Sequence, residues 1–257
     1  MSKPKKKWGQ NFLRNRGAAE RIVAAVEPRD GEIVLEIGPG EGALTEKLLD
    51  LGRPTVAIEI DPELAARMRS RFGDRLTVVN ADAIDADLPQ QPYRAVGNLP
   101  YNAGTPILRR VIADPRCRRA VFMLQKEVAE RLVAHPRDEP YGYLTLYAQL
   151  FADSRILMTL EPKSFHPAPK VRSAVVVLDP VPPRYTCDRE RLIALISASF
   201  RMRRKKLVNN LTDWLDLSRD AVHEAIAAAG LPEGVRAEEM SLQEFDALCR
   251  AIAHREL

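Results

Sequence analysis

Four consecutive residues carry the clearest chemical signal in the chain: Asn98, Leu99, Pro100 and Tyr101. The Asn98 side-chain oxygen and the Leu99 carbonyl can accept the two protons of an exocyclic adenine amine, which turns its lone pair out of conjugation with the ring. Pro100 has a fixed φ and biases Leu99 toward an extended conformation, which helps to hold that carbonyl in place. Tyr101 offers a ring face for stacking, worth ~1–3 kcal/mol per base and comparable with the few kcal/mol needed to extrude a base. These residues predict an amine acceptor facing a methyl donor, and the alternative is a proline turn with a packing tyrosine.

A glycine-rich loop at residues 38–42, Gly-Pro-Gly-Glu-Gly, predicts where such a donor would bind. Glycine lets the backbone turn sharply after a strand and approach a ligand closely. Glu59 ends the next strand, where a ribose diol would be held, and Asp82 follows the third, where a carboxylate could accept a hydrogen bond from adenine. The loop with Ala43 also satisfies the relaxed dinucleotide fingerprint, so nicotinamide or flavin binding competes. Hydride transfer has no need of the turn at residues 98–101, which favours methyl transfer.

The elements that position these residues follow from apolar runs of four to six residues. Such runs predict strands, and two intervening helical stretches, 43–51 and 62–72, predict crossover helices and a parallel sheet; the strands lie at 33–37, 56–60, 76–79, 120–124 and 174–178. The sequence Asp-Pro-Val-Pro-Pro-Arg at 179–184 breaks this periodicity. After it we expect only helices, at 189–200, 203–215, 219–229 and 242–253. The chain is therefore predicted to hold an α/β domain at 1–182 and a helical domain at 183–257.

Composition narrows the class of protein further. The chain has 257 residues, of which 46% are hydrophobic and 29% charged, with a net charge of +4. Basic residues cluster at 3–7, 109–119 and 201–206, which suggests a polyanion partner, although each cluster alone is also typical of a solvated face. Cys117, Cys187 and Cys249 show no paired spacing, so we expect buried thiols in a reducing compartment and neither disulfides nor a metal site. No apolar run approaches the ~20 residues of a membrane span, and we expect a cytoplasmic protein.

Several stretches, in order along nearly the whole chain, resemble the KsgA/RsmA branch of the ribosomal RNA adenine N6,N6-dimethyltransferases. The amino-terminal Gly-Gln-Asn-Phe-Leu stands at 9–13, the donor loop at 36–42 and the acceptor motif at 98–101. Phe-His-Pro-Ala-Pro-Lys-Val-Arg-Ser at 165–173 matches the family's Phe-x-Pro-x-Pro-Lys-Val-x-Ser. Residues 200–211 resemble its Arg-Arg-Lys…Asn-Asn-Leu segment. The resemblance implies a Rossmann-like class I methyltransferase with a mostly parallel seven-stranded sheet and a small all-α carboxy-terminal domain.

The resemblance also implies site residues. S-adenosylmethionine is expected to contact Asn11, Leu13, Gly38, Glu59, Asp82 and Asn98. The residue types support the last four independently, whereas Asn11 and Leu13 rest on the resemblance alone and would otherwise be a helix-capping asparagine and an apolar anchor. Phe165 is expected to stack on the flipped base opposite Tyr101, and its alternative is a core side chain. Ribosomal RNA is expected to contact Arg201, Arg203, Arg204, Lys205 and Lys206.

The implied activity is dimethylation of two adjacent adenosines near the 3′ end of 16S rRNA, in the small subunit or its precursor, by a monomer. No general base is required, because the methylated amine is acidic enough to lose its proton to water, so catalysis rests on positioning. The chain departs from the family's pattern at two places. Ala103 and Gly104 stand where the family has a bulkier pair, and Tyr143 stands where it often has arginine. Three alternatives remain: a large-subunit rRNA methyltransferase, a DNA or protein amine methyltransferase, and a non-catalytic assembly or transcription factor.

Overall fold

The computed structural model describes residues 5, 8–202, 205–215 and 218–253. The chain forms two compact units, Met1–Ala129 with Ala152–Pro180, and Glu130–Phe151 with Val181–Leu257. The boundary predicted at 182/183 lies close to Pro180, where the chain passes into the second unit for the last time. However, the prediction that all of 1–182 forms one domain is wrong for residues 130–151, which belong to the second unit. These residues join the helical unit because Tyr141 Oη donates a hydrogen bond to the Met240 carbonyl at 2.6 Å. The Arg137 N–H likewise donates to the Glu238 carbonyl at 2.8 Å.

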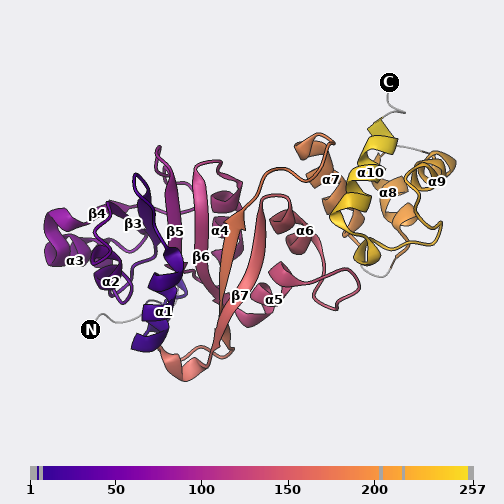
Figure 1. Ribbon diagram of the computed structural model, residues 1–257. Helices are drawn as coiled ribbons and strands as arrows, with labels where there is room; N and C mark the ends of the chain where they lie inside the picture. Colours follow the sequence, from indigo (N-terminus) through magenta and orange to yellow (C-terminus); the bar gives the residue numbers. More distant parts are fainter. Residues whose placement is uncertain (1–4, 6–7, 203–204, 216–217, 254–257) are drawn as a thin grey trace. The chain divides into compact units, whose positions relative to one another are not determined.

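A seven-stranded sheet forms the centre of the first unit (Figure 1). Its strand order is β4-β3-β2-β5-β6-β9-β7, and β9 alone runs antiparallel to its neighbours. The strands are β2 (Ile33–Ile37), β3 (Thr55–Glu59), β4 (Thr77–Asn80), β5 (Tyr93–Asn98), β6 (Cys117–Gln125), β7 (Ala152–Leu160) and β9 (Ser173–Pro180). The predicted α/β fold with a mostly parallel sheet is therefore confirmed, and the order reverses between β2 and β5, where open sheets of this type bind ligands.

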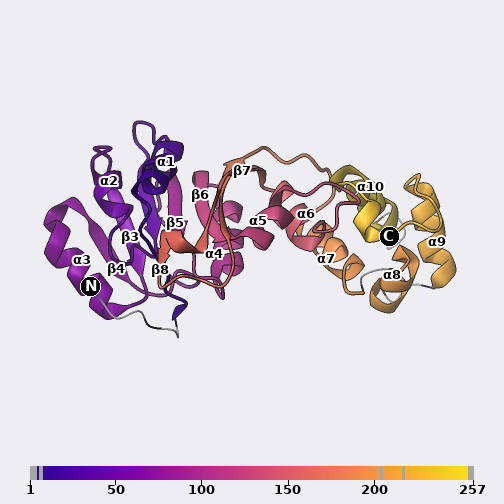
Figure 2. The same cartoon turned by 90° about the horizontal axis from the view of Figure 1, so that it is seen from below.

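Helices cover both faces of the sheet (Figure 2). On one face lie α1 (Arg16–Val26), α2 (Thr45–Leu49) and α3 (Pro62–Phe72), whose buried side chains pack against the strand residues on that side, such as Val121 and Met123. On the other face lies α4 (Gly104–Ala113). A Cβ built on Gly104 would come within 3.1 Å of Leu124, which alternates with Met123 along β6. Gly104 thus lets α4 approach the sheet closely. This packing explains why a glycine stands here in place of the bulkier residue expected from the resemblance.

Two short strands join the amino-terminal segment to the segment before β9. The strand β1 (Phe12–Leu13) pairs antiparallel with β8 (Phe165–His166), so that Leu13 lies opposite Phe165. A short 3₁₀ turn, η3 (Pro162–Ser164), precedes β8, and η2 (Gly73–Arg75) follows α3. The pairing brings the Gly-Gln-Asn-Phe-Leu stretch and the 165–173 stretch, far apart in sequence, to neighbouring positions.

In the described residues of the second unit, every regular element is a helix. The unit contains the end of α5 (Lys126–Val133), then α6 (Tyr143–Gln149), α7 (Arg189–Ser199), α8 (Leu207–Leu215), α9 (Arg219–Ala228), η4 (Ala237–Glu239) and α10 (Leu242–Ala253). The prediction of free cysteines is wrong for two of them, since Cys187 and Cys249 form a disulfide across 62 residues. The fold places Cys187, two residues before α7, next to Cys249 of α10, and the spacing of the cysteines in the sequence does not show this proximity. Cys117 is free and buried.

The helix predicted at 203–215 begins later, at Leu207. Asn210 is the physical reason, because its side-chain amide donates to the Ser199 carbonyl at 2.7 Å and to the Met202 carbonyl at 3.3 Å. These bonds hold the chain between α7 and α8 in a turn. Tyr143, the third departure noted in the sequence, begins α6 and packs its ring against Tyr147.

Candidate functional site

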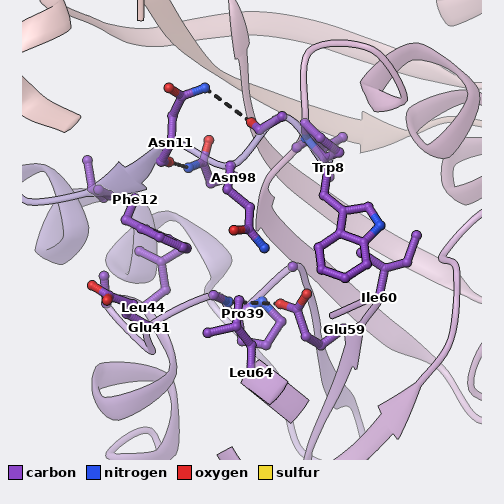
Figure 3. Close-up of a pocket in the computed structure, with 18 of the residues that line it drawn as sticks. Trp8, Asn11, Phe12, Pro39, Glu41, Leu44, Glu59, Ile60, Leu64 and Asn98 are labelled. Atoms are coloured by element: carbon purple, nitrogen blue, oxygen red, sulfur yellow. Dashed lines mark hydrogen bonds between the residues drawn. The ribbon is translucent and has the colours of Figure 1, made fainter. Parts of the chain in front are cut away.

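A pocket of the first unit lies at the carboxyl ends of β2, β3 and β5 (Figure 3). It brings together most of the site residues predicted from sequence. Its lining comprises Trp8, Gly9, Gln10, Asn11, Phe12, Leu13, Glu36, Gly38, Pro39, Gly40, Glu41, Ala43, Leu44, Glu59, Ile60, Leu64, Asn98, Leu99, Pro100 and Tyr101. The glycine loop, the Glu59 carboxylate and the Asn98–Tyr101 turn therefore border one cavity, with the amino-terminal segment as a further wall.

The glycine loop owes its shape to its sequence. Gly38, Gly40 and Gly42 have φ of 67°, 58° and 84°, a region that favours glycine. A Cβ on Gly40 would meet the Phe12 ring at 3.0 Å, so the loop and the amino-terminal segment are in close contact. The Gly40 N–H donates to Glu59 Oε2 at 3.1 Å, and the Asp61 N–H donates to Glu59 Oε1 at 2.9 Å. Glu59 is 3% exposed and is fixed by these two bonds with its remaining lone pairs available to a ligand.

A second carboxyl group, that of Glu36, forms part of the pocket floor. Glu36 is 1% exposed, and its Oε2 accepts a hydrogen bond from Thr45 Oγ1 at 2.7 Å. Burial raises the pKa of Glu36 to about 8; the Thr45 bond acts in the opposite direction, and the charge of nearby Glu59 raises it further. Burial also raises the pKa of Glu59, which the N–H groups of Asp61 and Gly40 partly offset. The pocket therefore holds two crowded acids, and a positive charge bound beside them would lower their raised pKa values.

Asp61 fastens the amino-terminal segment beside the pocket. Its carboxylate accepts hydrogen bonds from Lys5 Nζ at 3.0 Å, from Gln10 Nε2 at 3.2 Å and from the Glu63 N–H at 3.0 Å. Burial opposes ionisation of Asp61, but these donors outweigh it and lower the pKa of this carboxyl. The Lys5 ammonium also lies over the Trp8 ring, 4.9 Å from its centre. Trp8 and Gln10 are thus placed on the pocket wall by a residue at the start of α3.

The Asn98 amide is oriented by the amino-terminal segment (Figure 3). Its Nδ2 donates to the Asn11 carbonyl at 2.6 Å. Because a carbonyl oxygen only accepts, the amide group facing it must be the NH₂, which leaves Asn98 Oδ1 as an acceptor. The Asn11 side chain donates in turn to the Gly9 carbonyl at 3.1 Å. Asn11, which was expected at the site from the resemblance alone, therefore sets the direction of the Asn98 oxygen through its backbone.

Two predicted site residues do not line this pocket. Asp82 lies in the turn after β4, where its Oδ1 accepts a hydrogen bond from the Ile84 N–H at 2.9 Å. Phe165 is 5% exposed and belongs to the core cluster that also contains Leu13 and Val175. The structure thus places Asp82 in a turn and Phe165 in the core, which was the stated alternative for Phe165, and ligand contact by either one stays a prediction.

The basic clusters separate into two kinds. Within 109–119, Arg116 pairs with Asp114 at 2.8 Å, and Arg119 pairs with Asp179 and Glu27, both at 2.6 Å. Their charges are used inside the unit, which weakens the interpretation of this cluster as a polyanion site. In contrast, the side chains of Arg201, Lys205 and Lys206 are exposed between α7 and α8. Arg203 and Arg204, and most of the 3–7 cluster, lie outside the described residues.

Sequence reasoning missed two residues that shape the site. A Cβ on Gly97 would clash with the Ile37 carbonyl oxygen, so only glycine allows β5 to approach β2 immediately before Asn98. The signal was present, because a glycine inside a strand often marks a close backbone approach. Glu36 was noted only as part of the loop motif, and its burial could not be inferred from that position.

Comparison with known proteins decides the family. The sequence profile of the ribosomal RNA adenine dimethylases matches residues 1–253. The chain belongs to the ribosomal RNA adenine dimethylase family. This confirms the resemblance stated from the sequence motifs. It also confirms the predicted reaction class, transfer of methyl groups to adenine of ribosomal RNA, and the predicted donor, S-adenosylmethionine.

Relatives of this ribosomal RNA adenine dimethylase cover nearly its full length. The ribosomal RNA small subunit methyltransferase A of Methylococcus capsulatus is 42% identical over 97% of this chain and 98% of its own. The protein of the same name from Geobacter sulfurreducens is 40% identical over 96% and 95%. Among solved structures, a dimethyladenosine transferase from Plasmodium falciparum superposes with a TM-score of 0.80 at 26% identity, covering 96% of this chain and 98% of that one. The 23S rRNA methyltransferase ErmE gives 0.74 at 28%, covering 95% and 100%.

Proposed function

We propose that this protein dimethylates the N6 amines of two adjacent adenosines in the 3′-terminal hairpin of 16S rRNA, during assembly of the small ribosomal subunit. The observation that carries the proposal is the Asn98 amide, fixed by the Asn11 carbonyl at 2.6 Å with its oxygen free to accept. An acceptor at this position suits an exocyclic amine that has two protons to donate. The small-subunit assignment is supported by relatives about 40% identical that are named for that subunit.

The residues present fit S-adenosylmethionine, the methyl donor. Glu59 is placed to accept hydrogen bonds from ribose hydroxyls, and the glycine loop at Gly38 and Gly40 leaves room for close approach. The donor carries a sulfonium and an ammonium group, and their positive charge beside Glu36 and Glu59 would lower the raised pKa values of these two carboxyl groups. Asn11 and Leu13 supply the wall opposite, and Asp82 is proposed to contact adenine from beyond the described pocket.

The chain's own residues account for acceptor activation by alignment. Asn98 Oδ1 and the Leu99 carbonyl hold the two amine protons, which frees the nitrogen lone pair, and the proton released afterwards passes to water. The Leu99 backbone is itself held, because its N–H donates to the Met123 carbonyl at 3.1 Å. Holding the reacting groups in line is sufficient for a large rate gain. Ala103, beside the turn, has a small side chain that is compatible with a monomethylated amine in the second transfer, whereas Gly104 is accounted for by its close packing against Leu124 and Leu99.

We propose further that Arg201, Lys205 and Lys206, together with Arg203 and Arg204, bind rRNA phosphates. Exposed cations supply affinity, while the target is selected by shape and by exposed bases. The protein is proposed to act as a monomer in the cytoplasm, where precursor subunits assemble. No helix in the described ranges is both long and apolar enough to cross a membrane.

A second candidate substrate is the large-subunit rRNA, because ErmE, a 23S rRNA methyltransferase, is similar over nearly the whole chain. One experiment separates the two. Labelled S-adenosylmethionine is supplied with undermodified small subunits, large subunits and DNA in parallel, and the labelled nucleoside is identified after digestion. We expect N6,N6-dimethyladenosine from small subunits alone. Label in large subunits or DNA, with none in small subunits, would overturn the proposal.

A further inference from the structure

A partly buried hydroxyl pair joins the acceptor turn to the sheet. Tyr101 Oη lies 2.8 Å from Ser173 Oγ, where either hydroxyl can donate. Tyr101 stands in the turn between β5 and α4, so its own backbone is not held by strand pairing. Ser173 is the first residue of β9 and is fully buried, with Gln125 of β6 opposite on one side and Leu160 of β7 on the other. The Tyr101 ring, which lies in a turn, is therefore hydrogen-bonded to Ser173 at the start of β9, the middle one of three paired strands.

The hydrogen bond between Tyr101 Oη and Ser173 Oγ can fix the orientation of a stacking ring, and it is called the brace below. A bond to the phenol oxygen acts at the far end of the ring and restricts its tilt without covering its face. Burial raises the pKa of Tyr101, which the Ser173 hydroxyl partly offsets, so the phenol stays neutral and the bond persists at neutral pH. Among the described residues, neither hydroxyl makes a hydrogen bond to the other residues assigned above to the donor or to the adenine amine.

We propose that Ser173 is a positioning residue, which holds the Tyr101 ring at the angle that stacks the target adenine. This deepens the proposed function and rests on it, because it requires that an adenine enters beside Tyr101. Ser173 acts through Tyr101 and does not contact the reacting atoms. Its effect on the reaction therefore falls on the alignment of a bound base, and not on the affinity for the methyl donor.

The test compares Ser173→Ala, Tyr101→Phe and the double variant with the wild-type protein on undermodified small subunits. Each single variant removes one hydroxyl of the same bond, and a neutral bond of this kind is worth about 0.5–1.5 kcal/mol, or roughly 2- to 12-fold. We expect the single-turnover rate at saturating substrates to fall within that range in each. The double variant should be no slower than either single one, because the two hydroxyls act as one unit.

Ser154→Ala is the matched control, because the Ser154 hydroxyl is buried on β7 of the same sheet and has no hydrogen-bond partner among the described residues. It should keep the wild-type rate. In Ser173→Ala the dissociation constant for S-adenosylmethionine should stay near the wild-type value, and the melting temperature should fall by no more than the few degrees that the loss of one such bond causes. A merely structural serine would instead weaken donor binding together with the rate. A wild-type rate in Ser173→Ala, or losses that multiply in the double variant, would overturn the brace alone. An absence of dimethyladenosine from wild-type protein would instead overturn the proposed function, and the brace with it.

Discussion

Replacing Glu36 by glutamine tests whether the pocket floor holds a protonated acid. Burial raises the pKa of this carboxyl from 4.5 to about 8, which corresponds to roughly 5 kcal/mol at ~1.4 kcal/mol per unit. The folded protein keeps the proton up to about pH 8, whereas the unfolded chain loses it near 4.5. Between these values the folded state binds more protons, so the free energy of unfolding falls as pH rises. The Glu36→Gln variant has no such proton, and its curve lacks this contribution.

The assay is urea unfolding of wild-type protein and the Glu36→Gln variant at several values from about pH 5 to about pH 9. The difference in unfolding free energy, wild type minus variant, should decrease by several kcal/mol across this window. Thr45→Val removes the hydrogen bond that lowers the Glu36 pKa, and should move the decrease to higher pH. Parallel curves for wild type and Glu36→Gln would refute the reasoning, because they would mean that Glu36 titrates alike in the folded and unfolded states.

Three further changes have defined outcomes. Asp61→Asn should weaken the hold on Lys5 and Gln10, so that donor affinity measured by calorimetry falls several-fold; an unchanged affinity would mean that the wall of Trp8 and Gln10 does not depend on Asp61. Cys187→Ser should lower the unfolding free energy by about 4 kcal/mol, because the disulfide it removes closes a loop of 62 residues, and equal stability under reducing and oxidising conditions in the wild type would contradict this. Replacing the exposed cluster Arg201, Lys205 and Lys206 by alanine should reduce the slope of log binding constant against log salt by roughly one for each phosphate that is no longer neutralised; an unaltered slope would remove this cluster from the RNA interface.

Local sequence patterns were sufficient for much of the sheet and of the donor pocket. The run at 33–37 and the helix at Pro62–Phe72 were predicted with their observed bounds, because a continuous apolar run and a proline after the capping Asp61 are local signals. Gly38 follows β2, and Glu59 and Asn98 are the last residues of β3 and β5. Because neighbouring parallel strands end at the same edge of a sheet, the three residues could be expected to lie close together. The resemblance to the family predicted Asn11 as a site residue without a physical reason. The structure gives the reason, because the Asn11 carbonyl orients the Asn98 amide.

The remaining features depend on contacts between distant residues. Nothing local indicates that Cys187 meets Cys249, or that residues 130–151 leave the sheet domain to pack with the last helices. Burial of Glu36 and the bond between Tyr101 and Ser173 likewise arise only when strands distant in sequence pair. The late start of α8 reflects a side chain, Asn210, that competes with the helix by bonding to earlier carbonyls.

The most direct test of the central claim compares wild-type protein with Asn98→Ala on undermodified small subunits. Methylated adenosine, mono- and dimethylated, is measured over the first two transfers, and S-adenosylmethionine binding is measured separately by calorimetry. The position of Asn98 Oδ1, left free by the bond to Asn11, predicts that transfer is abolished while the dissociation constant for the donor stays within a few-fold of wild type. Undiminished transfer by Asn98→Ala would contradict the claim that this amide aligns the adenine amine.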